Sequence, residues 1–227
     1  MKNNKKKYKK VTYGDIFYFE LPNKKYVVGK VLFDVQKQCD REDIVVEYEN
    51  YMSSFGGCQL IEMYKGIYDN PNDIQKFETL IPRVFAYNID TKANTLPYGI
   101  LAQEKIDYTK VEFPEVLGMV YGVRLLRGEL AFFIEDDYIF DEEEENLGFP
   151  ISYGAEYPVV IAKMCLYMQG REDLIFGEFY RKDGLKDRDL LYHPELRRKL
   201  YKRVGEDPNK SYYDLALSHG YDLGRFY

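Results

Sequence analysis

Residues 13–32 read Tyr13-Gly14-Asp15-Ile16-Phe17-Tyr18-Phe19-Glu20-Leu21-Pro22-Asn23-Lys24-Lys25-Tyr26-Val27-Val28-Gly29-Lys30-Val31-Leu32. Side chains along a β-strand point to alternate faces of the sheet. In the first half of this stretch, Phe17, Phe19 and Leu21 therefore share one face of a predicted strand. Ile16, Tyr18 and Glu20 take the other face. The stretch predicts an antiparallel hairpin that seeds the sheet.

The second strand of the hairpin is predicted over residues 25–33. One of its faces carries Val27, Val31 and Phe33. Between the strands, Pro22 pre-sets φ for the second position of a turn, and Asn23 is well suited to the third. Gly29 interrupts the inward face and predicts a bulge or a close approach of another backbone.

Parts of this stretch resemble the opening of the bacterial immunity protein 26 family, over residues 13–33. The resemblance is carried by Gly14-Asp15-Ile16-Phe17, Leu21-Pro22, Tyr26 and Gly29-Lys30-Val31-Leu32. That family is associated with contact-dependent and polymorphic toxin systems. The resemblance implies a cytoplasmic, non-enzymatic protein that binds and blocks a cognate toxin domain.

The segment Gly14-Asp15-Ile16 is also similar to the start of small toxin endoribonucleases with an SH3-like barrel. Those enzymes have arginines before the glycine and an arginine-proline pair in the next strand. Here Lys10-Val11-Thr12-Tyr13 precedes the glycine, and the second strand reads Gly29-Lys30-Val31-Leu32. The similarity leaves a small barrel open as a fold, without the expected catalytic arginine.

Further strands and helices are predicted along the chain. Alternation and turn residues indicate strands at residues 44–48, 58–68, 81–87 and 96–106, a bent strand at 116–126, and its partner at 129–134. Residues 34–43 read as a loop. Helices are predicted over residues 158–168, 193–204 and 211–218, from proline or serine at the starts and glycine near the ends.

These elements predict an α+β protein. Its body is expected to be mainly an antiparallel sheet or a small SH3-like barrel, followed by a helical C-terminal segment. The expected divisions are a disordered basic tail at residues 1–10, a β-rich body at 11–146 and a helical segment at 147–227 packed on the body as one domain. The tail follows from composition, because short charged termini rarely order.

The charge and the cysteine content of the chain limit the classes of function that it can have. The chain of 227 residues has a net charge of −6, and its first ten residues hold six lysines and no acid, so the remainder carries −12. An acidic body argues against nucleic-acid binding, unless the lysine tail supplies it, and would suit a basic protein partner. Three unpaired cysteines and no apolar run of membrane length predict a cytoplasmic protein with no membrane contact.

Candidate catalytic residues are few. Cys165 with His193 or His219 could form a nucleophile–base pair, although Cys165 falls in a helix predicted to be buried, where thiols are inert. The metal-ligand spacings of zinc sites are absent from the sequence, as are the motifs of serine hydrolases, phosphate-binding loops and dinucleotide sites. The sequence therefore predicts no cofactor and no enzyme. A small-barrel hydrolase or nuclease is the alternative.

The most distinctive charged feature follows residue 134. Eight carboxylates fall within eleven residues: Glu135, Asp136, Asp137, Asp141, Glu142, Glu143, Glu144 and Glu145. This acidic segment can be a solvated loop, a phosphate mimic that enters a basic cleft of a toxin, or a Ca²⁺ or Mg²⁺ site without EF-hand spacing. For an immunity protein that occludes a toxin, the predicted contacts are Asp136, Asp137, Asp141, Glu142, Glu143, Glu144 and Glu145.

Overall fold

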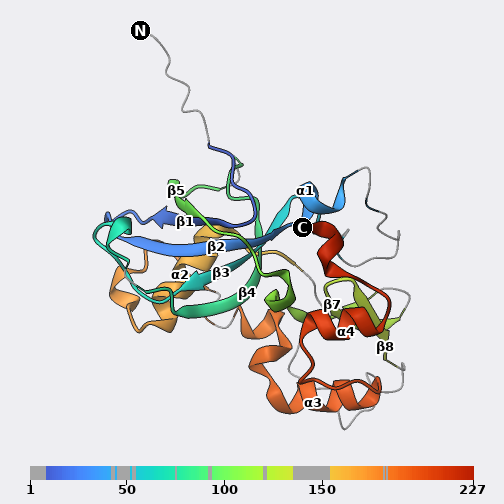
Figure 1. Ribbon diagram of the computed structural model, residues 1–227. Coiled ribbons are helices and arrows are strands. Elements are labelled where there is room, and N and C mark those ends of the chain that lie inside the picture. The colour runs from blue at the N-terminus through green and yellow to red at the C-terminus, as the bar shows by residue number, and fades with distance from the viewer. Residues whose placement is uncertain are drawn as a thin grey trace.

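The computed structural model describes residues 9–41, 44, 52, 55–74, 76–91, 94–119, 122–134, 154–180, 182 and 184–227. Two antiparallel sheets and several helices confirm the predicted α+β class (Figure 1). The strands are β1 (Asp15–Glu20), β2 (Tyr26–Asp34), β3 (Cys58–Tyr64), β4 (Thr79–Tyr87), β5 (Tyr98–Gln103), β6 (Glu115–Met119), β7 (Val123–Arg127) and β8 (Leu130–Phe133). The α-helices are α1 (Val35–Cys39), α2 (Pro158–Met168), α3 (Pro194–Arg203) and α4 (Tyr212–Ser218). The 3-10 helices are η2 (Pro71–Asp73), η3 (Tyr108–Lys110), η5 (Glu172–Leu174), η6 (Lys186–Arg188), η7 (Leu190–Tyr192) and η8 (Leu223–Phe226).

The predicted N-terminal hairpin is confirmed as β1 and β2. The amide of Lys24 donates to the carbonyl of Leu21 at 2.9 Å, and the amide of Leu21 donates to the carbonyl of Lys25 at 2.8 Å. Pro22 occupies the second turn position, as expected, and Lys24 takes a positive φ of 62°. The face carrying Phe17 and its neighbours is buried, and burying each such side chain contributes about 1.5–3 kcal/mol.

Gly29 marks a close backbone approach, one of the two alternatives that its position predicted. A Cβ at this position would lie 2.5 Å from the carbonyl oxygen of Glu62 and 2.8 Å from the Phe17 ring. The pairing of β2 with β3 shifts register further along, between Val31 and Phe33. Phe33 therefore packs in a different core from Val31.

The five-stranded sheet has the order β4-β3-β2-β1-β5, and the three-stranded sheet has the order β6-β7-β8. The alternative of an SH3-like barrel is wrong, because the described strands form no closed barrel. Strands β4 and β5 stand at opposite edges of the larger sheet and do not pair with each other.

Two local predictions are wrong. Residues 116–126 form parts of β6 and β7 rather than one bent strand, because Gly122, with a φ of 102°, helps to reverse the chain before Val123. Residues 34–43 contain helix α1, because the Asp34 side chain accepts a hydrogen bond from the amide of Lys37 and caps the helix. In the predicted strand at residues 44–48, all but Ile44 lie outside the described residues, and Ile44 itself lies in no strand.

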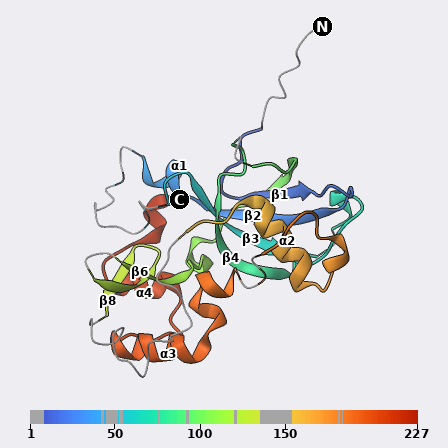
Figure 2. The same ribbon diagram turned by 180° about the vertical axis from the view of Figure 1, so that it is seen from behind.

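The C-terminal segment divides between two cores. Helix α2 covers one face of the five-stranded sheet, where Ile161, Met164 and Cys165 pack against residues of β1 to β4 (Figure 2). Helices α3, α4 and η8 pack with the three-stranded sheet in the second core, which also holds Phe33 and Phe85 of the larger sheet. Helices α2, α3 and α4 match the three helices predicted from the sequence to within one residue at each end. The Ser211 hydroxyl caps α4 by accepting a hydrogen bond from the amide of Asp214 at 3.0 Å.

Candidate functional site

The contacts predicted from the acidic segment lie outside the described residues, since the structure describes none of residues 135–153. The chain is described on both sides of this segment. Ile134 follows β8 and donates its amide to Val123 O at 2.8 Å, and Glu156 pairs with Ala86 at the end of β4. Ile134 and Ala155 are both buried in the second core. The undescribed residues 135–153 are thus bounded by packed residues on both sides.

Exposed aromatic side chains precede and follow residues 135–153, which contain the acidic segment. Phe133 on β8 is 49% exposed, and the guanidinium of Arg124, its partner in the register of β7 and β8, lies 5.6 Å from its ring centroid. Tyr157 precedes α2, is also 49% exposed, and packs on Tyr87 with ring centroids 4.7 Å apart. Aromatic and arginine side chains of this kind are enriched among residues that dominate protein–protein binding energy.

A separate cleft of about 510 Å³ is lined by tyrosines from distant parts of the chain. Tyr13 precedes β1, Tyr108 belongs to η3, and Tyr227 follows η8. The ring of Tyr227 meets Tyr13 nearly edge-on, with centroids 5.6 Å apart at 81°. It stacks with Tyr108 at 5.7 Å and 23°. The hydroxyl of Tyr227 donates to Leu32 O at 2.7 Å, so its ring is held in place.

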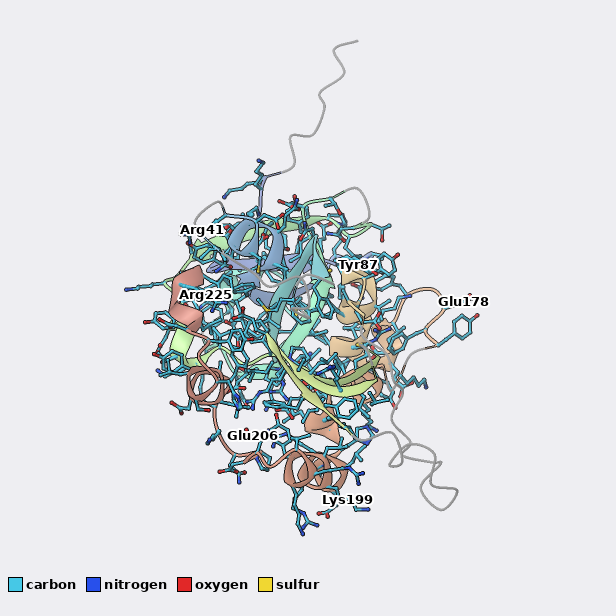
Figure 3. The ribbon with its side chains drawn as sticks, turned by 90° about the vertical axis from the view of Figure 1, so that its right-hand side faces the viewer. Arg41, Tyr87, Glu178, Lys199, Glu206 and Arg225 are labelled. Carbon is cyan, nitrogen blue, oxygen red and sulfur yellow. The ribbon has the colours of Figure 1, made fainter. Side chains whose placement is uncertain are left out.

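In the view of Figure 3, Arg225 of the C-terminal η8 lies on the left and Tyr87 of β4 lies to the right. Besides the three tyrosines, the cleft is lined by residues 103–106, of which Gln103 ends β5 and the other three follow it. These residues provide an acid and a base, Glu104 and Lys105.

A buried ionic network joins the two sheets to α3. Arg83 on β4 donates two hydrogen bonds to Asp189, at 2.6 and 2.8 Å, and its guanidinium also lies 3.4 Å from Glu115 on β6. Glu115 accepts hydrogen bonds from Arg197 on α3, and Arg127 on β7 lies 3.4 Å from it. These charges are paired with one another, so the network serves packing between elements rather than an exposed reaction centre.

Cys165 is completely buried on α2, as predicted, and burial raises the pKa of its thiol to about 12. At neutral pH the thiol is therefore protonated, whereas a cysteine nucleophile needs the thiolate. Nε2 of His193 contacts Lys186 O at 2.8 Å, and Nε2 of His219 contacts Glu206 at 2.8 Å. The structure thus disfavours the candidate pairing of Cys165 with either histidine.

A metal site, the lysine tail and a membrane-spanning helix were also considered from the sequence, and each can be compared with the described residues. Within it, no group of three or more histidine, cysteine or acidic side chains is placed to hold a metal ion. Of the lysine tail, residues 1–8 lie outside the described part, and Lys9 accepts a hydrogen bond through its carbonyl from the hydroxyl of Tyr98 at 2.9 Å. None of the helices in the described ranges is long and apolar enough to cross a membrane.

Comparisons of the chain with protein families, with curated proteins and with solved structures found no match in any of the three. The resemblance of residues 13–33 to an immunity family therefore stays a prediction from the sequence.

Sequence reasoning missed both the tyrosine cleft and the ionic network. The abundance of tyrosine, 23 residues in all, was compatible with a binding surface but did not indicate which tyrosines meet. Nothing in the sequence around Arg197 indicated that its side chain binds the buried Glu115 on β6. No local pattern marks either feature, because its members come from separate elements.

Proposed function

We propose that this protein is an immunity protein that binds a cognate bacterial toxin and neutralises it by occlusion. The observation that carries the proposal is that exposed aromatic side chains precede and follow residues 135–153, which contain the acidic segment. Phe133 with Arg124 lies before it, and Tyr157 with Tyr87 lies after it. Aromatic anchors beside a run of carboxylates suit a basic protein surface, because buried rings supply affinity and opposite charges speed association.

The first test is co-expression with the product of an adjacent toxin gene. The proposal expects the two proteins to co-purify, and cells that express the toxin to survive when this protein is present. A toxin that kills equally well with and without this protein, and does not co-purify with it, contradicts the proposal.

The second test asks whether this surface makes the contact. Tyr157→Ala is expected to weaken toxin binding by about thirtyfold or more, because truncation of a hot-spot residue costs about 2 kcal/mol or more. Replacing Asp141, Glu142, Glu143, Glu144 and Glu145 with serine is expected to weaken binding and to flatten its dependence on salt.

The matched control is Met168→Ala. Met168 is exposed like Tyr157, but it lies at the other end of α2, about 16 Å away by the rise of an α-helix. If Tyr157→Ala and Met168→Ala weaken toxin binding equally, Tyr157 is not a specific contact of the toxin.

A further inference from the structure

We propose that the tyrosine cleft, formed by Tyr13, Tyr108 and Tyr227, binds a cationic side chain, a guanidinium or ammonium group, of a protein partner. The identity of that partner as a toxin rests on the proposed function, whereas the binding of a cation rests on the cleft itself.

The tyrosine rings of the cleft are arranged both edge-on and in parallel. Tyr13 stands nearly perpendicular to Tyr227, and Tyr108 lies nearly parallel to it. Tyr213 extends the array, because its ring centroid lies 5.8 Å from that of Tyr108. The faces of aromatic rings carry negative partial charge, so several rings around one cleft attract a cation.

The rings are positioned before any ligand arrives. Tyr227 is anchored through its hydroxyl to Leu32 O, and Gln38 donates to the carbonyl of the preceding residue, Phe226, at 3.1 Å. A Cβ on Gly224 would lie 3.1 Å from the Tyr108 ring, so the backbone of η8 packs directly on that ring. Rigid rings lose little conformational entropy on binding, which favours recognition by contact with their faces.

Charges around the cleft favour a cation over an anion. The carboxylate of Glu104 lines the cleft and is half exposed; one of its oxygens binds Lys30 at 2.9 Å. Asp222 lies beside the array as well: its Oδ1 accepts a hydrogen bond from the amide of Gly224 at 2.8 Å, and a Cβ on Gly224 would lie 3.0 Å from that oxygen and 3.1 Å from the Tyr108 ring. Two carboxylates, Glu104 and Asp222, thus lie beside the rings, and Lys105 is the ammonium group that lines the cleft.

A guanidinium fits these groups better than other cations. It is planar and weakly hydrated, so it can stack on a tyrosine face while its N–H groups donate to a carboxylate. In the cleft, an arginine side chain can meet Tyr108 or Tyr227 with its flat face and Glu104 with its edge.

The test uses the whole protein labelled with ¹³C in its tyrosine rings and titrated with Nα-acetyl-arginine amide. The matched ligand is Nα-acetyl-citrulline amide, which has nearly the same shape without the charge. We expect saturable shifts of the ring signals of Tyr13, Tyr108 and Tyr227 with the arginine probe, and at least fivefold weaker binding of the citrulline probe. Fivefold corresponds to about 1 kcal/mol at 1.4 kcal/mol per factor of ten.

Variants locate the binding. Tyr108→Leu is expected to weaken the arginine probe at least fivefold, while Tyr108→Phe, which keeps the ring, changes it less than twofold. Tyr180→Leu is the control, because Tyr180 is 82% exposed and does not line the cleft. If circular dichroism shows that Tyr108→Leu is partly unfolded, Glu104→Gln takes its place. This variant is expected to bind the arginine probe at least twofold more weakly.

Three results would overturn the proposal: no saturable shift, citrulline binding as tightly as arginine, or tighter binding of Nα-acetyl-aspartate amide through Lys105. The test needs no toxin, so its failure is distinct from that of the proposed function. If the protein binds arginine and also binds a toxin, Tyr108→Leu should weaken both.

Discussion

Arg83 on β4 and Asp189, immediately before η7, form a buried ion pair with two hydrogen bonds across 106 positions of the chain. Asp189 also accepts hydrogen bonds from the amides of Glu115 and Leu191, at 3.2 and 3.0 Å. One carboxylate therefore ties the five-stranded sheet, the three-stranded sheet and the C-terminal segment together.

Removing one partner of this pair should be costly. Asp189→Asn leaves the Arg83 guanidinium, which is 4% exposed, without its main counter-charge. We expect the free energy of unfolding to fall by about 3–5 kcal/mol, the usual result of breaking a buried pair. Urea denaturation measures it. The control is Asp173→Asn, which breaks the solvent-exposed pair with Arg171 and should change stability far less. Equal losses in the two variants would contradict a special role for the buried pair.

The hairpin turn contains a residue whose backbone favours glycine. Lys24 has a φ of 62°, a conformation that costs a residue with a Cβ about 1–2 kcal/mol. After the entropy that glycine loses on folding, Lys24→Gly should raise the free energy of unfolding by up to about 1 kcal/mol. Thermal and urea unfolding would detect this gain. The adjacent Lys25→Gly should bring none, so a similar gain from both variants would show that the positive φ is not the cause.

Stability should fall in acid because of Glu115. Burial alone raises the pKa of this carboxyl, but hydrogen bonds and charges from Arg197, Arg83 and Arg127 outweigh it and lower the pKa overall. A lowered folded pKa means that the stabilisation is fully present above the unfolded value, about 4.3, and is lost as pH falls through the folded pKa.

The free energy of unfolding of Glu115→Gln and of the unsubstituted protein, measured across a range of pH, tests this dependence. The variant should be clearly less stable at pH 7, and the difference should shrink as the pH falls below the unfolded value. A difference that stays constant from neutral to acidic pH would mean that ionised Glu115 does not stabilise the fold.

The thiols should be slow to react in the native protein. Cys165 is inaccessible, and burial raises its pKa to about 12; burial also raises the pKa of Cys58 to about 11 and that of Cys39 to about 12. A disulfide exchange reagent at pH 8 should therefore modify the folded protein slowly and label three thiols quickly in denaturant. One rapidly labelled native thiol, lost in Cys165→Ser, would revive the proposal of a cysteine nucleophile.

Prediction from the sequence worked best where neighbouring residues decide the structure. The β1–β2 hairpin was read from alternation and Pro22, and α2 from an apolar run that begins with Pro158. It failed where one residue changes the path of the chain. Gly122 helps to split an apolar run into two strands, and Asp34 starts a helix in a segment that is polar enough to read as a loop.

The acidic segment was the strongest charged signal, and it lies in residues 135–153, outside the described part of the structure. The sequence alone supplies the argument for its role, while the structure shows that the described residues on either side of 135–153 include the exposed Phe133 and Tyr157. The tyrosine cleft had no local signal, since Tyr13, Tyr108 and Tyr227 meet only after the chain has folded.

By itself, the sequence determined the hairpin, the helices predicted over residues 158–168, 193–204 and 211–218, and the acidic character of the chain, because periodicity, capping residues and composition act locally. Only the tertiary structure decided that the strands form two sheets, that the helices divide between two cores, and that Arg83 meets Asp189. Those outcomes depend on contacts between residues far apart in the chain, which form when separate apolar faces are buried together.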